Sequence, residues 1–318
     1  MYCVKQEIMS YFCKIKDNFY VSFSTNYIKS SVESIIEHHK NSKSSVFIDI
    51  NNGYEDFVNT TQHFSNFNLI YYNMEHKYPI NENGELTWVS PYWMNVFNEM
   101  INHYDEIWDF QLENYEYFKY HKLDKLFRFK PLRYTNWFEQ FRKKQSEYVY
   151  EIQLEMSLTT RFRQNLFSKL TCGPVKQVNG YYNVLPDISI NFTNTNDINA
   201  KFYAKNNCKY GIDLPSRETP ITFNCFRIYE YICMNKPCVV CDPYKITSRK
   251  YFNDLCIYMD YLESYDLKQI LLKPPRTDVA ETFKQMTYSD KDYDEYRLNI
   301  IKDYKDRTGI TVPDSVML

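Results

Sequence analysis

The residues of this chain best suited to chemistry are an arginine and a glutamate three positions apart. Arg227 and Glu230 lie in the segment NCFRIYEYICMNKPCVV (residues 224–240), which predicts a helix, a turn at Asn-Lys-Pro and a buried strand. Residues at i and i+3 share one face of a helix, so we expect both side chains to point into one cleft. A guanidinium binds phosphate and a carboxylate binds vicinal hydroxyls, and a nucleotide sugar contains both groups.

The alternative for this pair is an ion pair of little energetic weight on an exposed helix face. However, the neighbours of the pair are apolar, among them Phe226, Ile228 and Ile232. Since an unpaired charge is costly to bury, this setting favours a cleft or a buried partner over open solvent.

A second basic segment, MSLTTRFR (residues 156–163), lies at a predicted strand-to-helix junction. The first turn of a helix presents free N–H groups and a partial positive charge, where a diphosphate can bind. Thr160 would cap this helix, and Arg161 and Arg163 would add positive charge. The alternative is that both arginines are solvated surface residues.

These residues depend on elements that alternate between strand and helix in both halves of the chain. The first half predicts strands over residues 19–24, 46–50, 68–72, 106–110 and 126–129, with helices over 30–38, 91–103 and 112–121. The second half predicts strands over residues 149–154, 175–178, 188–192, 210–214 and 238–241, with helices over 160–170, 197–204, 223–234 and 288–307. Short strands separated by helices predict parallel sheets covered on both faces.

We therefore expect an α/β fold with two Rossmann-like domains facing a central cleft. The expected divisions are an amino-terminal domain over residues 1–135, a linker over 136–150, a second domain over 151–275 and a helical tail over 276–318. The length of 318 residues suits two domains.

Composition narrows the class of protein. The net charge of −2 lacks the basic surplus typical of nucleic-acid binding, although Arg142-Lys143-Lys144 is a local basic patch. No apolar run reaches membrane-spanning length, and no signal peptide is recognisable. The cysteines are scattered, so we expect a reducing, cytoplasmic location. Frequent Asn, Lys, Ile and Tyr indicate an AT-rich genome, such as that of a virus or phage; the location would then be the host cytoplasm.

Candidate metal and redox motifs are weak. Cys238 and Cys241 form one C-x-x-C without a second pair, which favours reduced cysteines buried in a strand over a zinc or redox site. The acidic run from Asp290 to Asp294 predicts a helix start rather than a metal site. No P-loop, G-x-G-x-x-G or G-x-S-x-G motif occurs. We expect no metal and no cofactor.

Four segments, in chain order, resemble the GT-B glycosyltransferases, including viral and bacterial members. NLIYYNMEH (residues 68–76) is similar to their Y-N-x-E strand end, and YDEIWDFQLEN (104–114) to their D-x-V-W-D-x-S-x-x-N strand end, with Gln111 at the serine position. Residues 156–163 match the junction that faces the donor diphosphate, and residues 227–237 the donor-binding helix and its K-P turn. The resemblance spans residues 65–245 in outline.

The resemblance implies a hexosyl- or pentosyltransferase that moves a sugar from a nucleotide sugar, expected to be a UDP-sugar, to an acceptor hydroxyl. It places the donor on Thr160, Arg161, Arg163, Arg227 and Glu230.

An inverting reaction needs a general base, and open α/β sheets place their sites at the carboxyl ends of strands. Glu75, Asp49 and Asp109 lie at such predicted ends and are the candidate catalytic residues. For each of them a loop-capping or solvated acid is the alternative, and retaining members of the family lack a dedicated base.

Two acceptor classes are open, a hydroxymethylated base in double-stranded phage DNA and a glycan, protein or lipid of a surface. The acidic balance of the chain favours the second class. A different possibility is a non-catalytic Rossmann-like nucleotide-binding or structural protein, which the missing glycine-rich loop allows.

Overall fold

A computed structural model shows two compact units. Unit 1 comprises Met1–Arg133 and Arg297–Leu318, and unit 2 comprises Tyr134–Tyr296. The residues that the structure describes are 12–16, 19–22, 26–36, 45–50, 64, 66–74, 99–142, 148–155, 161, 163–165, 176–178, 181–183, 190–192, 197–214, 225–242, 244–259 and 267–317.

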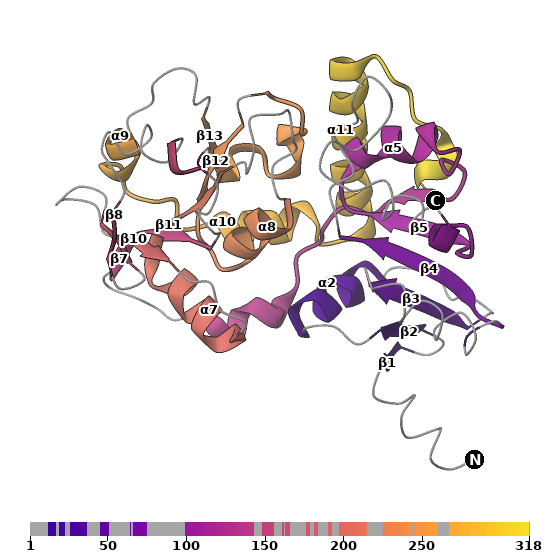
Figure 1. Cartoon of the computed structure of the whole chain (residues 1–318), viewed down its shortest axis with the longest axis horizontal. Helices are drawn as coiled ribbons and strands as arrows, with labels where there is room; N and C mark the ends of the chain where they lie inside the picture. The colour runs from indigo at the N-terminus through magenta and orange to yellow at the C-terminus, as the bar shows by residue number, and fades with distance from the viewer. Residues whose placement is uncertain are drawn as a thin grey trace, which may run out of the picture. The chain divides into compact units, whose positions relative to one another are not determined.

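Unit 1 is built on a six-stranded sheet whose strands lie side by side in chain order (Figure 1). β1 pairs with β2 antiparallel, and β2 to β6 are parallel. The strands are β1 (Phe12–Lys16), β2 (Phe19–Ser22), β3 (Val46–Ile50), β4 (Asn68–Asn73), β5 (Glu106–Asp109) and β6 (Phe127–Phe129). β3 is buried at every residue and β4 at all but its first, as expected of strands in the interior of a covered sheet.

The helices of unit 1 come from both parts of the chain that form it. Those whose bounds are described are α2 (Asn26–Ile36), η1 (Leu112–Asn114), α5 (Tyr115–Tyr120), the second part of α11 (Asp290–Thr308) and η6 (Asp314–Met317). In α11, the long yellow helix of Figure 1, Arg297 donates from Nη2 to the carbonyls of Phe129 (2.9 Å) and Met317 (2.7 Å). The segment after residue 296 is therefore bound to the end of β6.

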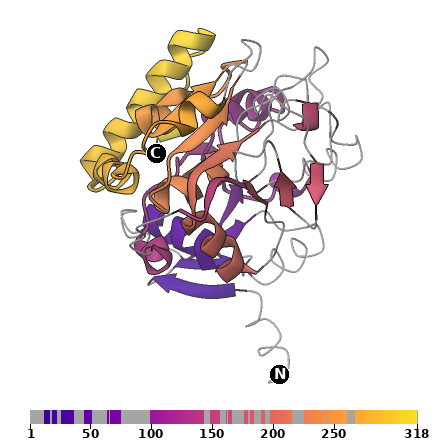
Figure 2. The same ribbon diagram turned by 90° about the vertical axis from the view of Figure 1, so that its left-hand side faces the viewer.

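Unit 2 contains a fully parallel sheet of five strands in the order β10-β7-β11-β12-β13. Its strands are β7 (Tyr150–Leu154), β10 (Ile190–Phe192), β11 (Cys208–Asp213), β12 (Cys238–Cys241) and β13 (Cys256–Met259). β8 (Lys176–Val178) and β9 (Tyr181–Asn183) form a separate antiparallel hairpin, drawn in pink-red in Figure 2. Numbered along the chain, the sheet order is 2-1-3-4-5, one of the doubly wound orders.

The helical elements of unit 2 whose bounds are described are η2 (Asn136–Phe141), α7 (Ile198–Asn206), α8 (Cys225–Cys233), η3 (Arg249–Tyr251), η4 (Asn253–Leu255), α9 (Leu267–Leu271), α10 (Val279–Met286) and the start of α11. α8 packs so closely on β11 that a Cβ added at Gly211 would lie 2.5 Å from the ring of Tyr231. Glycine at this position is what lets the helix approach the strand.

The turn predicted after the helix of residues 223–234 is present and is anchored. Asn235 has a φ of +60°, a left-handed conformation that asparagine tolerates. Its side chain donates to the carbonyl of Thr277 (2.7 Å) and accepts from the backbone N–H of Ala280 (3.1 Å). The turn thereby binds α8 to the start of α10.

The chain is an α/β protein of two Rossmann-like units, which confirms the predicted fold class. The units divide after residue 133 and, inside α11, after residue 296. Residues 136–142 of the predicted linker belong to unit 2, where Arg142 Nε donates to the carbonyl of Cys233 (2.7 Å). Residues 297–317 of the predicted tail belong to unit 1. A cleft between the two domains stays a prediction.

Helices of the described part of the chain are too short or too polar to cross a lipid bilayer.

Candidate functional site

The carboxyl edge of the unit 2 sheet has the topology of a ligand site. After β7 the chain enters β10 on one side of β7 and then β11 on the other side. Open α/β sheets bind ligands outside the carboxyl ends of the strands at such a switch point. Here the two strands that flank it are followed by Glu155 and Leu214, and Asp213 is the last residue of β11.

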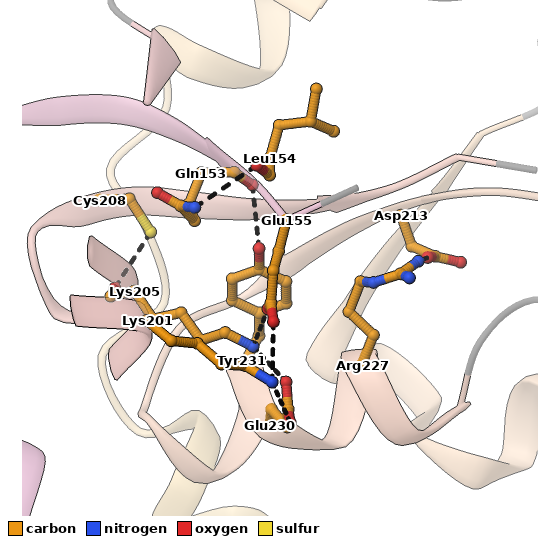
Figure 3. A network of polar contacts seen from close by, with 10 residues as sticks. All are labelled: Gln153, Leu154, Glu155, Lys201, Lys205, Cys208, Asp213, Arg227, Glu230 and Tyr231. Atoms are coloured by element: carbon orange, nitrogen blue, oxygen red, sulfur yellow. Dashed lines mark hydrogen bonds and ion pairs between the residues drawn. The ribbon is translucent and has the colours of Figure 1, made fainter. Parts of the chain in front are cut away.

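Arg227 reaches this edge from the first turn of α8. Its Nη1 lies 2.7 Å from Oδ1 of Asp213, and the two side chains are 22% and 3% exposed (Figure 3). Burial lowers the pKa of Arg227, but the ion pair and hydrogen bond with Asp213 outweigh it, so the net shift is upward. The guanidinium is therefore fully charged, and the Arg227 side chain as a whole is partly exposed.

Arg163 lies close to the same carboxylate. Its Nη2 donates to the carbonyl of Leu214 (3.2 Å). The pKa of Arg163 is lowered, first by burial and then by the charge of Arg227, while Asp213 acts in the opposite direction. The structure thus brings together two of the arginines predicted to bind the donor. Arg161 is exposed on the same short helical segment.

Beside this pair, Glu155, Lys201, Lys205 and Glu230 form a closed ring of charges, called here the Glu–Lys ring. Lys201 Nζ lies 2.8 Å from an oxygen of each glutamate, and Lys205 Nζ contacts the other oxygen of each (Figure 3). Two positive and two negative charges make the ring neutral. Its exposure is uneven: the side chains of Glu155 and Lys201 are 16% and 14% exposed, and those of Glu230 and Lys205 are 3% and 0% exposed.

Local sequence explains how the ring forms. Lys201 and Lys205 are four residues apart on α7, so they share one face of that helix. Asp197 caps the helix, since its side chain accepts from the backbone N–H groups of Asn199 (2.9 Å) and Ala200 (3.4 Å). Both lysines therefore reach the end of β7 from a fixed helix.

The Glu–Lys ring packs against an aromatic side chain that is itself hydrogen-bonded to a strand. Lys205 Nζ lies 4.4 Å from the centre of the Tyr231 ring, a cation–π distance. The Tyr231 hydroxyl donates to the carbonyl of Gln153 in β7 (3.0 Å). Burial raises the pKa of Tyr231 well above its ordinary value, so the phenol stays protonated and donates.

Glu230 is placed differently from the prediction that it points with Arg227 into a cleft. It is 2% exposed, and both of its oxygens accept from lysines. A direct contact with ribose would require the displacement of both lysines. In the conformation described, Glu230 is an internal counter-charge. The direct ribose contact stays a prediction.

Sequence reasoning missed four residues of this arrangement: Glu155, Lys201, Lys205 and Asp213. Signals for them exist, because Glu155 directly follows a predicted strand and Asp213 lies near the end of another. Lys201 lies in a predicted helix, and Lys205 has i, i+4 spacing from it, one residue beyond the predicted end. Thr160 lies outside the described residues.

In unit 1, the predicted catalytic acid Asp109 is an interior acceptor. It has no exposed surface. Its Oδ2 accepts from the side-chain amides of Asn73 (2.7 Å) and Asn114 (2.9 Å), and its Oδ1 accepts from the backbone N–H of Gln111 (2.8 Å). The D-x-x-x-x-N spacing thus serves to join the ends of β4 and β5 to the following turn. A general base must reach the acceptor hydroxyl, and that role of Asp109 stays a prediction.

Asp49 is likewise interior, at 1% exposure, and accepts a hydrogen bond from the hydroxyl of Tyr104. Burial and the charge of Asp49 raise the pKa of Tyr104 far above its ordinary value, so the tyrosine remains the donor. The catalytic role of Asp49 likewise stays a prediction. Glu75, the third candidate, lies outside the described residues.

The candidate metal motifs have structural explanations. No group of three or more His, Cys, Asp or Glu side chains suited to a metal ion occurs within the described ranges. Cys238 and Cys241 are free thiols buried in β12, as predicted. Asp292 accepts from the Ser289 N–H (3.1 Å) while the Ser289 hydroxyl accepts from the Asp292 N–H (3.2 Å). This reciprocal cap confirms the predicted helix start.

Comparison with known proteins gives a match in structure alone. No protein-family profile matches the chain, and no curated protein matches it in sequence.

Among solved structures, the chain is similar to the wall teichoic acid polymerase TagF, with 11% identity and a TM-score of 0.34 over 87% of this chain and 86% of that one. It is also similar to the glycotransferase of kitacinnamycin, with 10% identity and a TM-score of 0.35 over 89% and 80% of the two chains. The glycosylation-associated Gap123 complex of Streptococcus agalactiae gives 10% identity and a TM-score of 0.35 over 91% and 57%. Values this low carry no activity from these proteins to the chain.

Proposed function

We propose that the chain is a glycosyltransferase that takes a sugar from a nucleoside-diphosphate sugar and transfers it to a hydroxyl group. The observation that supports this most directly is the pair Arg227 and Arg163 beside Asp213, at the switch point of a parallel sheet. Two guanidiniums and one carboxylate leave a net positive charge at the edge where such sheets bind ligands. A diphosphate matches that charge and the donor geometry of arginine.

The resemblance of four segments to GT-B glycosyltransferases supports the same proposal from the sequence. Two of those segments, residues 156–163 and 227–237, contain the arginines that meet at this edge. Thr160 and Arg161 belong to the first of them and are proposed to contact the same diphosphate. UDP is the proposed nucleotide.

In the proposed reaction, the acceptor oxygen bonds to the anomeric carbon as the bond from that carbon to the diphosphate oxygen breaks. Arg227 and Arg163 would stabilise the negative charge that develops on the departing diphosphate. The acceptor proton would pass to a base if the reaction inverts, and Glu75 is the proposed base. The transferred sugar would be a hexose or a pentose, and residues other than Arg227, Arg163 and Glu75 would select it.

For the acceptor, the net charge of −2 favours a glycan, protein or lipid over modified double-stranded DNA. The proposed location is the cytoplasm, or the host cytoplasm for a viral chain. The free buried cysteines, which include Cys208 and Cys225, suit such a reducing compartment.

One observation favours a second candidate, a nucleotide-binding protein without transferase activity. Asp49 and Asp109, the candidate bases that the structure describes, are both buried. A protein that binds a nucleotide sugar but does not transfer the sugar needs no accessible base, and it would therefore fit that arrangement.

A thermal-shift screen with UDP, GDP, CDP and their sugars tests binding, and release of free nucleoside diphosphate from the best donor tests turnover. Binding with turnover supports the transferase, and binding without turnover across glycan and hydroxymethylated-DNA acceptors supports the second candidate. The absence of any nucleotide-dependent shift would contradict both.

A further inference from the structure

The Glu–Lys ring presents one carboxylate at the candidate site and keeps the other inside. Glu155 directly follows β7, one of the two strands that flank the switch point, whereas Glu230 lies in the interior on α8. The Glu155 side chain is 16% exposed and that of Glu230 is 3% exposed. Of the two acids, Glu155 is the one that a ligand at this edge would meet.

The Oε1 atom of Glu155 is suited to accept a further hydrogen bond. Its Oε2 atom is buried and faces Lys205. Oε1 accepts from Lys201 at 2.8 Å, and a carboxylate oxygen has two lone pairs. A ligand group that donates one hydrogen bond can therefore be added without breaking the ring.

The charges around Glu155 specify which kind of ligand group this is. A phosphate would be repelled by the carboxylate and is attracted instead to Arg227 and Arg163 beside Asp213. A cation finds no unbalanced negative charge, because the two lysines already neutralise the two glutamates. A neutral hydrogen-bond donor, such as a hydroxyl group, is neither repelled by the carboxylate nor in need of an unbalanced negative charge.

The ring also fixes the carboxylate before a ligand arrives. Lys201 and Lys205 hold both of its oxygens, and Lys205 is itself held between two carboxylates and the Tyr231 ring. A group that is already oriented loses little conformational entropy on binding.

We infer that Glu155 is a binding residue that accepts a hydrogen bond from a ribose hydroxyl of the bound nucleotide, with Lys201 and Lys205 as its positioning residues. The inference rests on the proposed function, since it assigns one more contact of the same nucleotide site. The diphosphate then lies toward β11 and the ribose toward β7. Glu155 selects the ribose, and Glu230 holds the two lysines in place from the interior.

The test compares a nucleoside diphosphate with its 2′,3′-dideoxy form, with UDP and dideoxy-UDP as probes and calorimetry as the measurement. Wild-type protein should prefer UDP by roughly tenfold or more, the usual effect of a hydrogen bond to a charged group. Glu155→Gln should reduce this preference to near unity, with little change in affinity for the dideoxy form. If Glu155→Gln does not fold, Glu155→Asp keeps the charge, withdraws the carboxylate by one methylene and should reduce the preference in the same way.

Glu139→Gln is the control because it removes one glutamate charge outside the ring, where Glu139 pairs with Lys284 at 3.4 Å. It should leave the ratio of UDP to dideoxy-UDP affinity unchanged. A lost preference in Glu230→Gln with an intact one in Glu155→Gln would overturn the inference and assign ribose to Glu230. An intact preference in both Glu155→Gln and Glu230→Gln would also overturn it and leave the proposed function standing. If wild-type protein binds no nucleotide, the proposed function and the inference fail together.

Discussion

At the scale of single residues, Arg227 combines a fixed partner with an exposed part of its side chain. It is anchored by an interior carboxylate, Asp213, yet keeps 22% of its side chain exposed. An anchored guanidinium has already lost most of its rotamer freedom, so binding a phosphate orders little more. This is why Arg227 is the first position to change in a test of donor binding.

Arg227→Ala should weaken the binding of a nucleoside diphosphate about 10- to 100-fold, since a hydrogen bond to a charged group contributes about 1.5–3 kcal/mol. Calorimetric titration measures the effect. Arg249→Ala is the matched control: Arg249 pairs with Asp242 at the end of the neighbouring strand β12, with Nε 3.3 Å from Oδ2, and its side chain is 42% exposed. Equal losses in the two variants would show that general charge, not position, sets the affinity.

Glu230→Gln should lower the free energy of unfolding by about 3 kcal/mol, because it leaves two buried or half-buried lysines with one counter-charge fewer. Urea denaturation without ligand measures this. Adding Lys205→Met to the variant should recover part of the loss, since the second change removes the uncompensated charge. An unchanged unfolding midpoint in the single variant would contradict the interior role of Glu230.

The Glu–Lys ring also predicts a dependence of stability on pH. Burial acts to raise the pKa of Glu155, but Lys205 and Lys201 outweigh it, and the pKa in the folded protein is lowered. A lowered pKa stabilises the fold at pH values above the unfolded pKa of about 4.3, and this contribution is lost as the pH falls through the folded pKa.

The free energy of unfolding of wild-type protein should thus decline below about pH 4.3, and Glu155→Gln should make the decline shallower. Denaturant unfolding at a series of pH values from 7 to 3 provides the comparison. A decline of equal slope in both proteins would mean that other carboxylates account for it.

At the scale of elements, the contact of α8 with β11 positions the site. The ring of Tyr231 lies directly over Gly211, and its hydroxyl is bound to β7. The same helix places Arg227 and Glu230 toward two different partners. The close approach at Gly211 therefore determines where both charged side chains end.

Gly211→Ala should destabilise the protein by about 1–3 kcal/mol, the usual effect of overpacking a core, because the new Cβ would lie 2.5 Å from the ring of Tyr231, which is buried and held by its hydroxyl. It should also weaken nucleotide binding by displacing Arg227. Gly309→Ala provides a contrast: Gly309 has a φ of +72° and no atom within 4 Å of an added Cβ, so its loss reflects backbone strain alone and leaves nucleotide affinity intact.

The local pattern of apolar and polar residues predicted most elements, because burial in these elements follows directly from that pattern. The apolar segments of β3 and β4 were predicted nearly residue for residue, as was the helix α8. β13 was missed because its four residues, CIYM, are too few to show a period, and only pairing with β12 defines it.

The site was predicted less completely because it depends on tertiary pairing. The i, i+3 spacing correctly grouped Arg227 and Glu230 on one helix. No local rule specifies that Arg227 pairs with Asp213 while Glu230 pairs with two lysines of α7. Asp109 and Asn114 were recognised as a motif, while their mutual hydrogen bond assigns them a structural use. Spacing identifies which residues share a face, and the partner comes from another element.

At the scale of the whole molecule, unit 1 is completed by a distant part of the chain. Arg297 is 5% exposed and binds the carbonyls at the end of β6 and at Met317. Arg307 reaches Glu113, which is 2% exposed, at 3.2 Å. Val316 is fully buried. These contacts make residues 297–317 a part of the unit 1 core.

Arg297→Met should lower the free energy of unfolding by about 2 kcal/mol or more, since one buried and one part-buried carbonyl lose their donor. Arg276→Met is the control, because Arg276 pairs with Asp254 and Asp278 on an exposed surface, where such pairs contribute less than about 1 kcal/mol. Urea unfolding curves of the two variants should separate clearly. Coincident curves would mean that the segment after residue 296 adds little to unit 1.

Because a chain is synthesised from its amino terminus, the completion of unit 1 by residues 297–317 has a further consequence. Every strand of unit 2 has been synthesised before residue 297, whereas β6 must wait through residues 134–296 for the arginine that binds its last carbonyl. Domains generally fold as units during synthesis. Unit 2 can therefore reach its final form on a nascent chain while unit 1, although begun first, is finished second. The last carbonyl of β6 thus lacks its arginine donor until Arg297, on the far side of unit 2 in the sequence, has been synthesised.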